Sequence, residues 1–277
     1  MNKKFFNFIL KTLYLFRKNT FSKYLIENLA YFIRSLLSVF HKSFKKKDIN
    51  GYKRIYHVHV MRSGGTSINQ YLLNSITGAN SNIKTIEENI NPITRHKKIN
   101  GLPYVSFNTS LINKGAYFFA HSHQPMHKLK IEHDTFSFTV LREPLDRIFS
   151  WYKAIKYPLG SHSKYFLMEK DYIKENFILT LENLEPNILN RQLYTFSKNL
   201  DINEGLKNLE KLSKIFFHSN LQEVQKEFES KLGFKEDFIK INSSKAIYDF
   251  EGNDENMLKV ILSKEYEFYK AALSKFA

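Results

Sequence analysis

Cysteine is absent from this sequence of 277 residues. Disulfide bonds, a thiolate nucleophile and a cysteine-ligated zinc site are therefore excluded. Internal repeats and low-complexity tracts are also absent, and the length suffices for one large domain or two small ones. No cluster of metal ligands stands out, so we expect no metal site.

The sequence also lacks an uninterrupted apolar run long enough to cross a membrane. The run at residues 5–16 is too short to cross a bilayer and contains Lys11, and the stretch 24–40 is interrupted by Glu27 and Arg34. No small-residue cleavage site follows, so the sequence does not indicate a secretory signal. A signal-anchor of unusual span is the alternative, and we expect a cytoplasmic protein.

Positive charge is abundant and unevenly distributed. The net charge is +15, and residues 1–50 contain eleven Lys or Arg against two Asp or Glu. These residues are also rich in aromatic and aliphatic side chains, and a basic amphipathic helical segment of this kind suits an anionic membrane surface. The alternative is that its helices pack on the main domain. We predict a basic segment at 1–50, peripheral at the inner face of the membrane, and a domain at 51–277.

Beyond residue 50, β-prone apolar runs alternate with segments of helical periodicity. This alternation predicts an α/β fold of three layers, α/β/α, with helices on both faces of a central, mostly parallel sheet. Residues 78–102 are polar and are predicted to be loop with short helical turns. Strands are predicted at 54–60, 117–120, 135–141 and 215–218, and helices at 66–76, from Pro144 through Ile155, across most of 165–195, at 221–232 and at 256–276.

The most informative stretch follows the first predicted strand and reads Arg62-Ser-Gly-Gly-Thr-Ser67. Gly64 and Gly65 lack a Cβ, so their amides can approach a ligand closely. The unpaired N–H groups of the next helix point the same way, and the helix dipole favours negative charge there. Arg62 adds a positive charge, and hydroxyl side chains flank the glycines. This P-loop-like unit predicts a phosphate site; a plain turn without a ligand is the alternative.

The loop is not a standard Walker loop, which reads Gly-x-x-x-x-Gly-Lys-[Ser/Thr]. The lysine position is occupied by Gly65, and the first glycine position by His59. A kinase or nucleoside triphosphatase would therefore lack its phosphate-binding lysine.

A second motif follows the strand predicted at 135–141. The strand delivers Arg142 to its carboxyl end, where ligands bind in open α/β sheets. Ser150 lies about 9 Å along the following helix. A forked guanidinium matches phosphate oxygens, so the two side chains could hold one phosphate together. Alternatively, Arg142 pairs with a structural carboxylate and Ser150 packs within the helix.

Together and in this order, the two motifs resemble those of the PAPS-dependent sulfotransferases, where PAPS is 3′-phosphoadenosine 5′-phosphosulfate. The resemblance is to the Golgi-type and bacterial carbohydrate enzymes related to the heparan sulfate 2-O group. Segments Asn187–Leu193 and Ile215–Phe234 are similar to later parts of that family, so the resemblance extends from Arg54 to the C-terminus. It implies a carbohydrate O-sulfotransferase with PAPS as donor and a glycan or glycolipid as acceptor.

The resemblance also implies which residues bind the donor. The loop would bind the 5′-phosphosulfate and the second motif the 3′-phosphate, and Arg62 would stabilise charge on the leaving phosphate. Many members have Pro-Lys where this chain has Met61-Arg62. The positive charge is kept, but Arg62 has a forked guanidinium in place of the compact ammonium that a lysine would bring to the sulfuryl group. The implied donor-binding residues are Arg62, Ser63, Gly64, Gly65, Thr66, Ser67, Arg142 and Ser150.

Transfer to a hydroxyl requires a base, and imidazole has a suitable pKa. The similar enzymes place a catalytic histidine after the strand that corresponds to 117–120. Alignment on Ala-His makes the base His121, and alignment on His-Ser-His makes it His123; we prefer His121. The alternative is that the histidine has only a structural role. His57 and His59 are two residues apart, lie on one face of the predicted strand and are expected to be structural.

Two other classes of function remain open. One is a P-loop-type kinase or other phosphotransferase, and the other is a non-catalytic basic protein that binds a membrane. The net charge permits the second, but it is concentrated in residues 1–50. No nucleic-acid motif appears, so we expect no nucleic-acid partner. Acceptor specificity is expected in the loops at 78–115 and 156–165.

Overall fold

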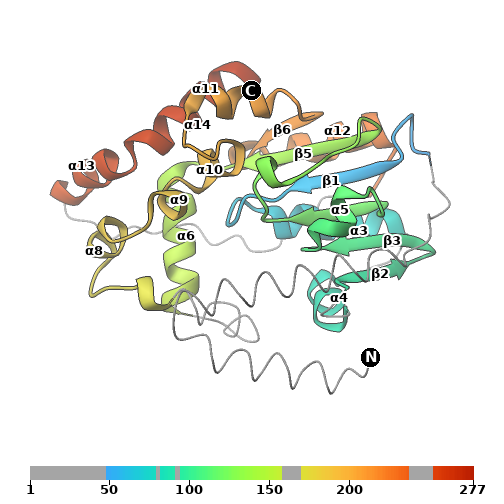
Figure 1. Cartoon of the computed structure of the whole chain (residues 1–277), viewed down its shortest axis with the longest axis horizontal. Helices are drawn as coiled ribbons and strands as arrows, with labels where there is room; N and C mark the ends of the chain where they lie inside the picture. The colour runs from blue at the N-terminus through green and yellow to red at the C-terminus, as the bar shows by residue number, and fades with distance from the viewer. Residues whose placement is uncertain (1–47, 79–81, 91–93, 158–169, 237–251) are drawn as a thin grey trace.

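The computed structural model describes residues 48–78, 82–90, 94–157, 170–236 and 252–277. Its centre is a six-stranded sheet in the order β2-β3-β4-β1-β5-β6 (Figure 1). The β2–β3 pair is antiparallel and the other neighbouring pairs are parallel. The strands are β1 (Arg54–Val58), β2 (His96–Ile99), β3 (Leu102–Ser106), β4 (Phe119–Ser122), β5 (Thr135–Leu141) and β6 (Lys214–Phe217).

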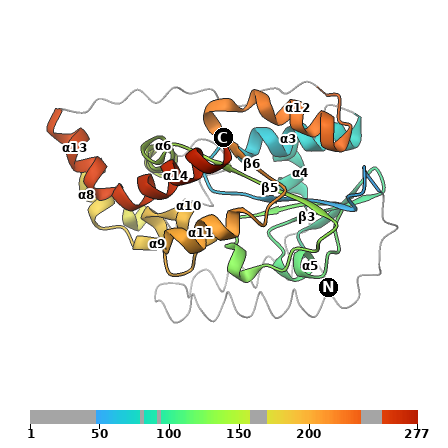
Figure 2. The same cartoon turned by 90° about the horizontal axis from the view of Figure 1, so that it is seen from above.

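Helices cover both faces of this sheet. Figure 2 shows α3 and α12 on one side of the strands, with α5, α10 and α11 on the other. The predicted mostly parallel sheet with flanking helices is therefore confirmed. The helices are α3 (Gly65–Thr77), α4 (Ile83–Asn89), α5 (Thr109–Asn113), α6 (Pro144–Lys156), α8 (Phe177–Glu182), α9 (Pro186–Leu189), α10 (Arg191–Phe196), α11 (Ile202–Leu209), α12 (Gln222–Leu232), α13 (Gly252–Ile261) and α14 (Ser263–Phe276).

Strand β1 shows why the sheet needs two helical layers. Its five residues are all buried, and successive side chains point to opposite faces. Ile55 belongs to the apolar cluster that includes α3 and α12, whereas Tyr56 and Val58 belong to the cluster that includes α10 and α14. Strand β5 is also buried along its whole length. Both central strands therefore lie in the interior, as in parallel sheets generally.

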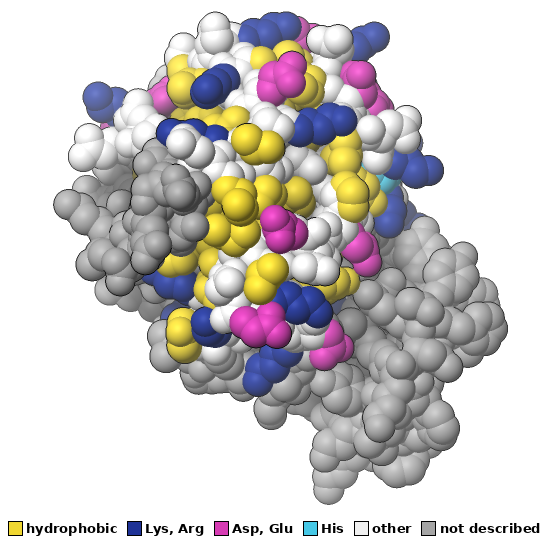
Figure 3. All heavy atoms as spheres, turned by 90° about the vertical axis from the view of Figure 1, so that its left-hand side faces the viewer, with side chains coloured by type: hydrophobic (Ala, Val, Ile, Leu, Met, Phe, Trp, Pro, Cys, Tyr) yellow, Lys and Arg dark blue, Asp and Glu magenta, His cyan; other side chains and the backbone are white. Residues whose placement is uncertain are grey.

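A third apolar cluster is formed by α6, α8 and α13. It includes Trp151 of α6, Leu181 of α8 and Leu258 of α13. Figure 3 views the end of the molecule that carries α8 and α13, and it shows hydrophobic side chains interspersed with charged ones. Met257 and Val260 of α13 are exposed. Helix α13 therefore presents apolar side chains outward as well as inward.

The predicted elements are present with shifted bounds. The strand predicted at 117–120 is β4 and lies two residues later, so His121 belongs to the strand and His123 follows it. The predicted C-terminal helix is divided at Leu262 into α13 and α14. From residue 170 onward, the stretch predicted as mostly helical consists of short helices separated by turns.

The prediction of loop with short helical turns at 78–102 is wrong for its second half. Strands β2 and β3 form a hairpin there, with Ile99 opposite Leu102. Asn100 and Gly101 make the turn with φ of 48° and 78°, as a type I′ turn requires. Strand β2 lies at the sheet edge and has no apolar run, and the apolar run of β3 is short and contains Pro103. The Asn-Gly pair is the signal that the sequence offers.

Two predictions fall wholly or partly on residues that the structure does not describe. Residues 1–47 of the basic segment lie outside the described residues, as does the predicted acceptor loop from residue 158 onward. Within the described ranges, no helix has both the length and the apolar character needed to cross a membrane.

Candidate functional site

The two motifs predicted to bind phosphate meet at one edge of the sheet. Strands β1 and β5 are neighbours and run parallel, so their carboxyl ends lie side by side. The loop at 62–67 follows β1, and Arg142 follows β5 directly. Helix α6 then carries Ser150 back past the same edge. Ligands of open α/β sheets bind at this edge, and the candidate site is defined here as the loop together with Arg142 and Ser150.

The loop backbone has the geometry expected of the predicted anion site. Arg62 and Gly64 have φ of 69° and 87°, and the left-handed Gly64 is the N-cap of α3, with no side-chain cap and no acidic residue in the first turn. Ser67 donates its N–H to the carbonyl of Gly64 at 3.1 Å. Among the described residues, the N–H groups of residues 64–66 have no backbone acceptor. They therefore remain available to a negatively charged ligand.

Gly65 has no room for a side chain. A Cβ at this position would lie 2.2 Å from Nε2 of His59 and 2.7 Å from Cε1 of His57. The start of α3 thus rests directly on two imidazole rings of the sheet. The position that a Walker loop gives to lysine is closed by packing, which explains its glycine in physical terms.

Arg62 links the loop to the second motif. Its Nε and Nη2 donate to Oγ of Ser150 at 3.1 and 3.0 Å, and Arg142 Nη1 donates to the carbonyl of Arg62 at 3.1 Å. The predicted loop, Arg142 and Ser150 are therefore brought together. The hydroxyl of Ser150 contacts Arg62, whereas the sequence prediction placed it beside Arg142.

The charges at this junction are unbalanced. Burial lowers the pKa of Arg62, and the positive charge of Arg142 lowers it further. None of the ion pairs among the described residues involves Arg62, and Arg142 has a long one, at 3.8 Å to Asp146. The Nε of Arg142 and the Oγ of Ser63 are buried without a hydrogen-bond partner among the described residues. Two close guanidinium cations, with the Nε of Arg142 unsatisfied, favour an anionic ligand.

Helix α10 holds Arg142 in place. The side chain of Gln192 accepts from the N–H of Arg142 and donates to its carbonyl, both at 2.8 Å. Glu265 of α14 accepts from the N–H groups of Gln192 and Leu193 at 2.9 and 3.2 Å, and it forms an ion pair with Arg147 at 3.3 Å. The Asn-Arg-Gln-Leu segment thus supports the site through Gln192, which the sequence analysis did not single out.

Four histidines line the sheet beneath the loop. His57 and His59 come from β1 and the residues after it, and His121 and His123 from β4 and the residue after it. The ring centroid of His59 lies 4.8 Å from that of His57, 4.6 Å from that of His123 and 5.8 Å from that of His121. His59 therefore connects Gly65 with both candidate bases. The sequence predicted only a structural role for His59, although the period-two spacing of His57 and His59 places both on one face.

The surroundings hold three of these imidazoles neutral. Burial lowers the pKa of His57 to about 3, against the effect of its hydrogen bond to Asn69. Burial also lowers the pKa of His123 to about 3, with the charge of Arg191 as a further cause. The pKa of His59 is held well below its usual value by burial and by His123. Each ring keeps a lone pair, but a positive charge on it is disfavoured.

His121 has a different environment because it contacts a carboxylate. Its Nε2 lies 2.8 Å from Oη of Tyr104 and 3.3 Å from Oε1 of Glu87 on α4. Burial alone would raise the pKa of Glu87, but the hydrogen bond and charge of His121, together with Arg95 and Tyr104, lower it to about 2. Glu87 is therefore a carboxylate at neutral pH. Of the two predicted bases, His121 contacts a carboxylate, whereas His123 is the more exposed.

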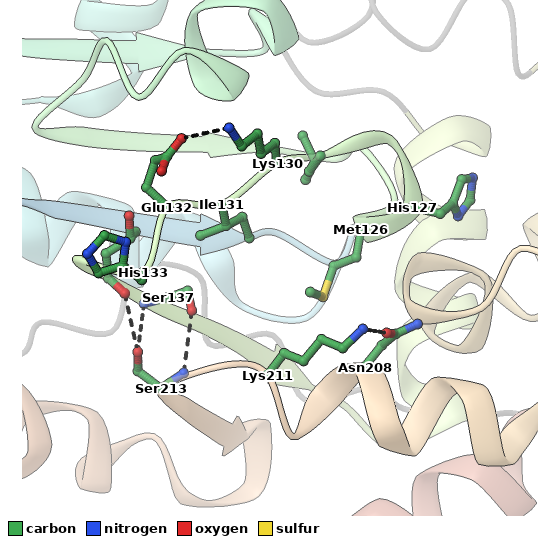
Figure 4. Close-up of a pocket in the computed structure, with 12 residues that line it drawn as sticks. Met126, His127, Lys130, Ile131, Glu132, His133, Ser137, Asn208, Lys211 and Ser213 are labelled. Atoms are coloured by element: carbon green, nitrogen blue, oxygen red, sulfur yellow. Dashed lines mark hydrogen bonds and ion pairs between the residues drawn. The ribbon is translucent and has the colours of Figure 1, made fainter.

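A separate pocket of about 600 Å³ lies away from this site. Its lining includes Thr135, Ser137 and Ser213, which lie at the amino ends of β5 and β6. Figure 4 shows that its two lysine ammonium groups have partners: Lys130 contacts Glu132, and Lys211 contacts Asn208. The pocket therefore lacks the two adjacent guanidinium groups found at the junction of Arg62 and Arg142.

No protein-family model matches this chain, and no curated protein matches it. Function is therefore inferred from the groups that converge at the carboxyl edge of the sheet. These are two arginines, the loop amides and hydroxyls, and an imidazole paired with a carboxylate. These are groups that could bind an anion and accept a proton.

Proposed function

We propose that this chain is a sulfotransferase of the PAPS-dependent, P-loop-like class, which transfers a sulfuryl group from PAPS to a hydroxyl of a carbohydrate acceptor. The observation that carries the proposal is the junction of Arg62, Ser150 and Arg142. It joins the two motifs that the family resemblance assigns to opposite ends of one bisphosphorylated nucleotide. A donor with two separate phosphate groups uses both motifs, whereas a single anion would need one.

In this proposal each motif binds one end of the donor. The loop amides, Arg62 and the hydroxyls of Ser63, Thr66 and Ser67 bind the 5′-phosphosulfate, and Arg142 with Ser150 binds the 3′-phosphate. The buried, unpartnered Oγ of Ser63 and Nε of Arg142 support this assignment, because a bound anion would satisfy both. At position 65 there is no room for a side chain, because a Cβ would lie 2.2 Å from Nε2 of His59. A lysine therefore does not fit there, which disfavours the alternative of a phosphotransferase with a loop lysine.

Catalysis then combines proton removal with charge stabilisation. His121 takes the proton of the acceptor hydroxyl while the hydroxyl oxygen forms a bond to sulfur. The bond between sulfur and the bridging phosphate oxygen breaks, and the electron pair leaves with the 3′,5′-bisphosphorylated product, PAP. Arg62 and the loop amides stabilise the charge on that leaving phosphate. We assign the base to His121 because Glu87 stabilises its protonated form, with His123 as the alternative base.

The acceptor is proposed to be a glycan or glycolipid, and residues 1–50 would hold the domain at the cytoplasmic face of an anionic membrane. This part of the proposal rests on the composition of residues 1–50, with eleven Lys or Arg among many aromatic side chains. It is independent of the donor site, so a domain that starts at residue 51 should still bind the donor.

The deciding experiment is incubation of the full chain with PAPS carrying labelled sulfur and a panel of glycans and glycolipids. We expect label on at least one acceptor and thermal stabilisation by PAP. ATP, which has no 3′-phosphate, should stabilise less. If neither label transfer nor stabilisation by PAP is found, the proposal is wrong. Stabilisation by ATP alone would favour the phosphotransferase, and vesicle binding alone would favour the non-catalytic membrane protein.

Variants assign the parts of the site in the same assay. Arg142→Ala should weaken PAP binding about tenfold or more, since it removes a charge-assisted contact. His121→Gln should leave PAP binding unchanged and reduce turnover by about 10²–10⁴-fold. Lys130→Ala, in the separate pocket, is the matched control and should change neither. If His121→Gln is fully active, the role of base passes to His123.

A further inference from the structure

A buried polar network surrounds His121 and is not used by donor binding. Glu87 of α4 contacts Arg95 and accepts from Oγ of Ser106 at 3.0 Å through one carboxylate oxygen, and it contacts Tyr104 and His121 through the other. Tyr104 and His121 come from the neighbouring strands β3 and β4. The network thus joins a helix and two strands at one carboxylate.

The proton positions in this network follow from its chemistry. Burial and the negative charge of Glu87 hold the pKa of Tyr104 well above its usual value, so Tyr104 keeps its proton. The carboxylate of Glu87 can only accept, and Tyr104 therefore donates its O–H to Glu87. The Oη of Tyr104, 2.8 Å from Nε2 of His121, is then an acceptor. It follows that Nε2 of a neutral His121 carries the proton and Nδ1 carries the lone pair.

The other ring nitrogen of His121, Nδ1, has a different environment. Nδ1 is buried and has no hydrogen-bond partner among the described residues. The rings of Phe107 and His59 are among the neighbours of His121, with centroids 5.1 and 5.8 Å away. Phe107 offers no polar group, and His59 is held neutral by burial. A buried imidazole nitrogen without a partner keeps a free lone pair. Nε2 of His57 and Nδ1 of His59 are in the same state, so His121 is distinguished by the carboxylate and the phenol at its other nitrogen.

We propose that Glu87 and Tyr104 are positioning residues that fix His121 as its Nε2–H tautomer, so that Nδ1 is the atom that takes the acceptor proton. The inference deepens and rests on the proposed sulfuryl transfer, since it names the partner groups of its base. Glu87 acts through Tyr104 and His121 and does not itself touch the substrate. The arrangement follows the logic of a carboxylate that orients an imidazole and stabilises its protonated form.

The network is also tied to the donor loop through α3. The N–H at the start of α4, on Ile83, donates to Oε1 of Gln70 on α3 at 2.8 Å. Arg95 holds the far side of the Glu87 carboxylate and donates from Nε to the carbonyl of Ser106 at 3.3 Å. Helix α4, which carries Glu87, is thereby anchored to the helix whose N-terminus forms the anion site.

The tautomer is measured directly by NMR on the full chain labelled with ¹⁵N-histidine. Long-range ¹H–¹⁵N spectra distinguish protonated from unprotonated ring nitrogens, and the His121 signals are identified by their loss in His121→Gln. We expect a protonated Nε2 and an unprotonated Nδ1 at neutral pH. In Tyr104→Phe and Glu87→Gln this preference should weaken. A wild-type His121 with its proton on Nδ1 overturns the inference whether or not any variant folds.

Turnover gives the second readout. Glu87→Gln and Tyr104→Phe should each reduce kcat about tenfold or more while leaving the KM for PAPS unchanged, because they act on the base and not on donor binding. Glu88→Gln, the exposed neighbour on α4, is the matched control and should keep the wild-type kcat. Unchanged kcat in both network variants would contradict the positioning role. If the wild type transfers no sulfuryl group, the proposed function fails, and the NMR experiment still decides the tautomer.

Discussion

At residue 65, the side chain is set by what lies beneath the loop. A Cβ there would meet His59 and His57 at 2.2 and 2.7 Å, distances at which atoms cannot remain in place. Gly65→Ala should therefore lift the start of α3 or displace the imidazoles, and we expect it to lower the free energy of unfolding by about 1–3 kcal/mol. Urea unfolding followed by circular dichroism measures the loss, and PAP titration should show weaker binding.

Two further variants separate crowding from conformation. Gly65→Ala combined with His59→Ala removes the closest clash and should recover part of the lost stability. Gly78→Ala is the contrasting case, because nothing lies within 4 Å of its added Cβ and only its φ of 62° is unfavourable. A Gly65→Ala protein as stable as the wild type would show that the loop does not rest on the histidines.

The contacts of Arg62 explain why an arginine, and not a lysine, occupies this position. Its guanidinium reaches Ser150 with two nitrogens and leaves its carbonyl for Arg142. A lysine could supply one donor atom at that hydroxyl but not two. The departure from the Pro-Lys of similar enzymes thus fits the way in which this chain joins its two motifs.

At the scale of elements, one buried ion pair connects α6, α10 and α14. Glu265 is fully buried, pairs with Arg147, and accepts from the first N–H groups of α10. Glu265→Ala leaves a buried guanidinium unpaired and α10 without its cap, so we expect a loss of about 3–5 kcal/mol in the free energy of unfolding. The loss is measured by urea denaturation.

An exposed ion pair provides the control for that loss. Lys275 and Glu210 also contact each other, but both side chains are about half exposed. Glu210→Ala should therefore cost about 1 kcal/mol or less. Equal losses from Glu265→Ala and Glu210→Ala would mean that burial of the first pair adds nothing. Glu265→Ala should also weaken PAP binding, because Gln192 then holds Arg142 less firmly.

Elements with a strong local pattern could be predicted from the sequence. Strand β5 is a continuous run of buried, β-prone residues, and α6 begins at a proline and repeats its apolar residues at helical spacing. The β2–β3 hairpin could not be predicted in this way. Strand β2 is largely polar because it is an edge strand, β3 is short and contains Pro103, and the hairpin is stabilised by the pairing of β3 with β4.

The residues of the site likewise include some that could be predicted from the sequence and some that could not. The loop, Arg142 and Ser150 are contiguous motifs at the ends of predicted strands, so their meeting follows once the sheet is parallel. Glu87, Tyr104 and Gln192 reach the site through tertiary contacts. Glu87 lies in a short helix within a polar stretch, and nothing local indicates that it faces His121, 34 residues later. Such partners can be identified only when the fold is known.

For the whole molecule, the most consequential feature is the number of ionisable groups held in one protonation state. His57, His59 and His123 stay neutral in the folded protein, whereas in the unfolded chain they take up protons below a pKa of about 6.5. Their contribution to stability is complete above that pH. It is lost as the pH falls toward their lowered pKa values, about 3 for His57 and His123. Glu87, with its pKa lowered to about 2, adds to the loss below about pH 4.5.

The free energy of unfolding should therefore fall steadily between pH 6.5 and pH 4.5. Each fully buried histidine adds a slope of about 1.4 kcal/mol per pH unit, because the unfolded state binds one more proton. Urea denaturation at several pH values measures this slope.

His57, which is fully buried and stacks on Phe138 with ring centroids 4.5 Å apart, is the residue to test. His57→Gln should reduce the slope whatever it does to stability at neutral pH, whereas His133→Gln, at an exposed position, should leave the slope unchanged. A stability that does not vary over this pH range would mean that these histidines bind protons as readily in the folded protein as in the unfolded chain, so that burial does not hold them neutral.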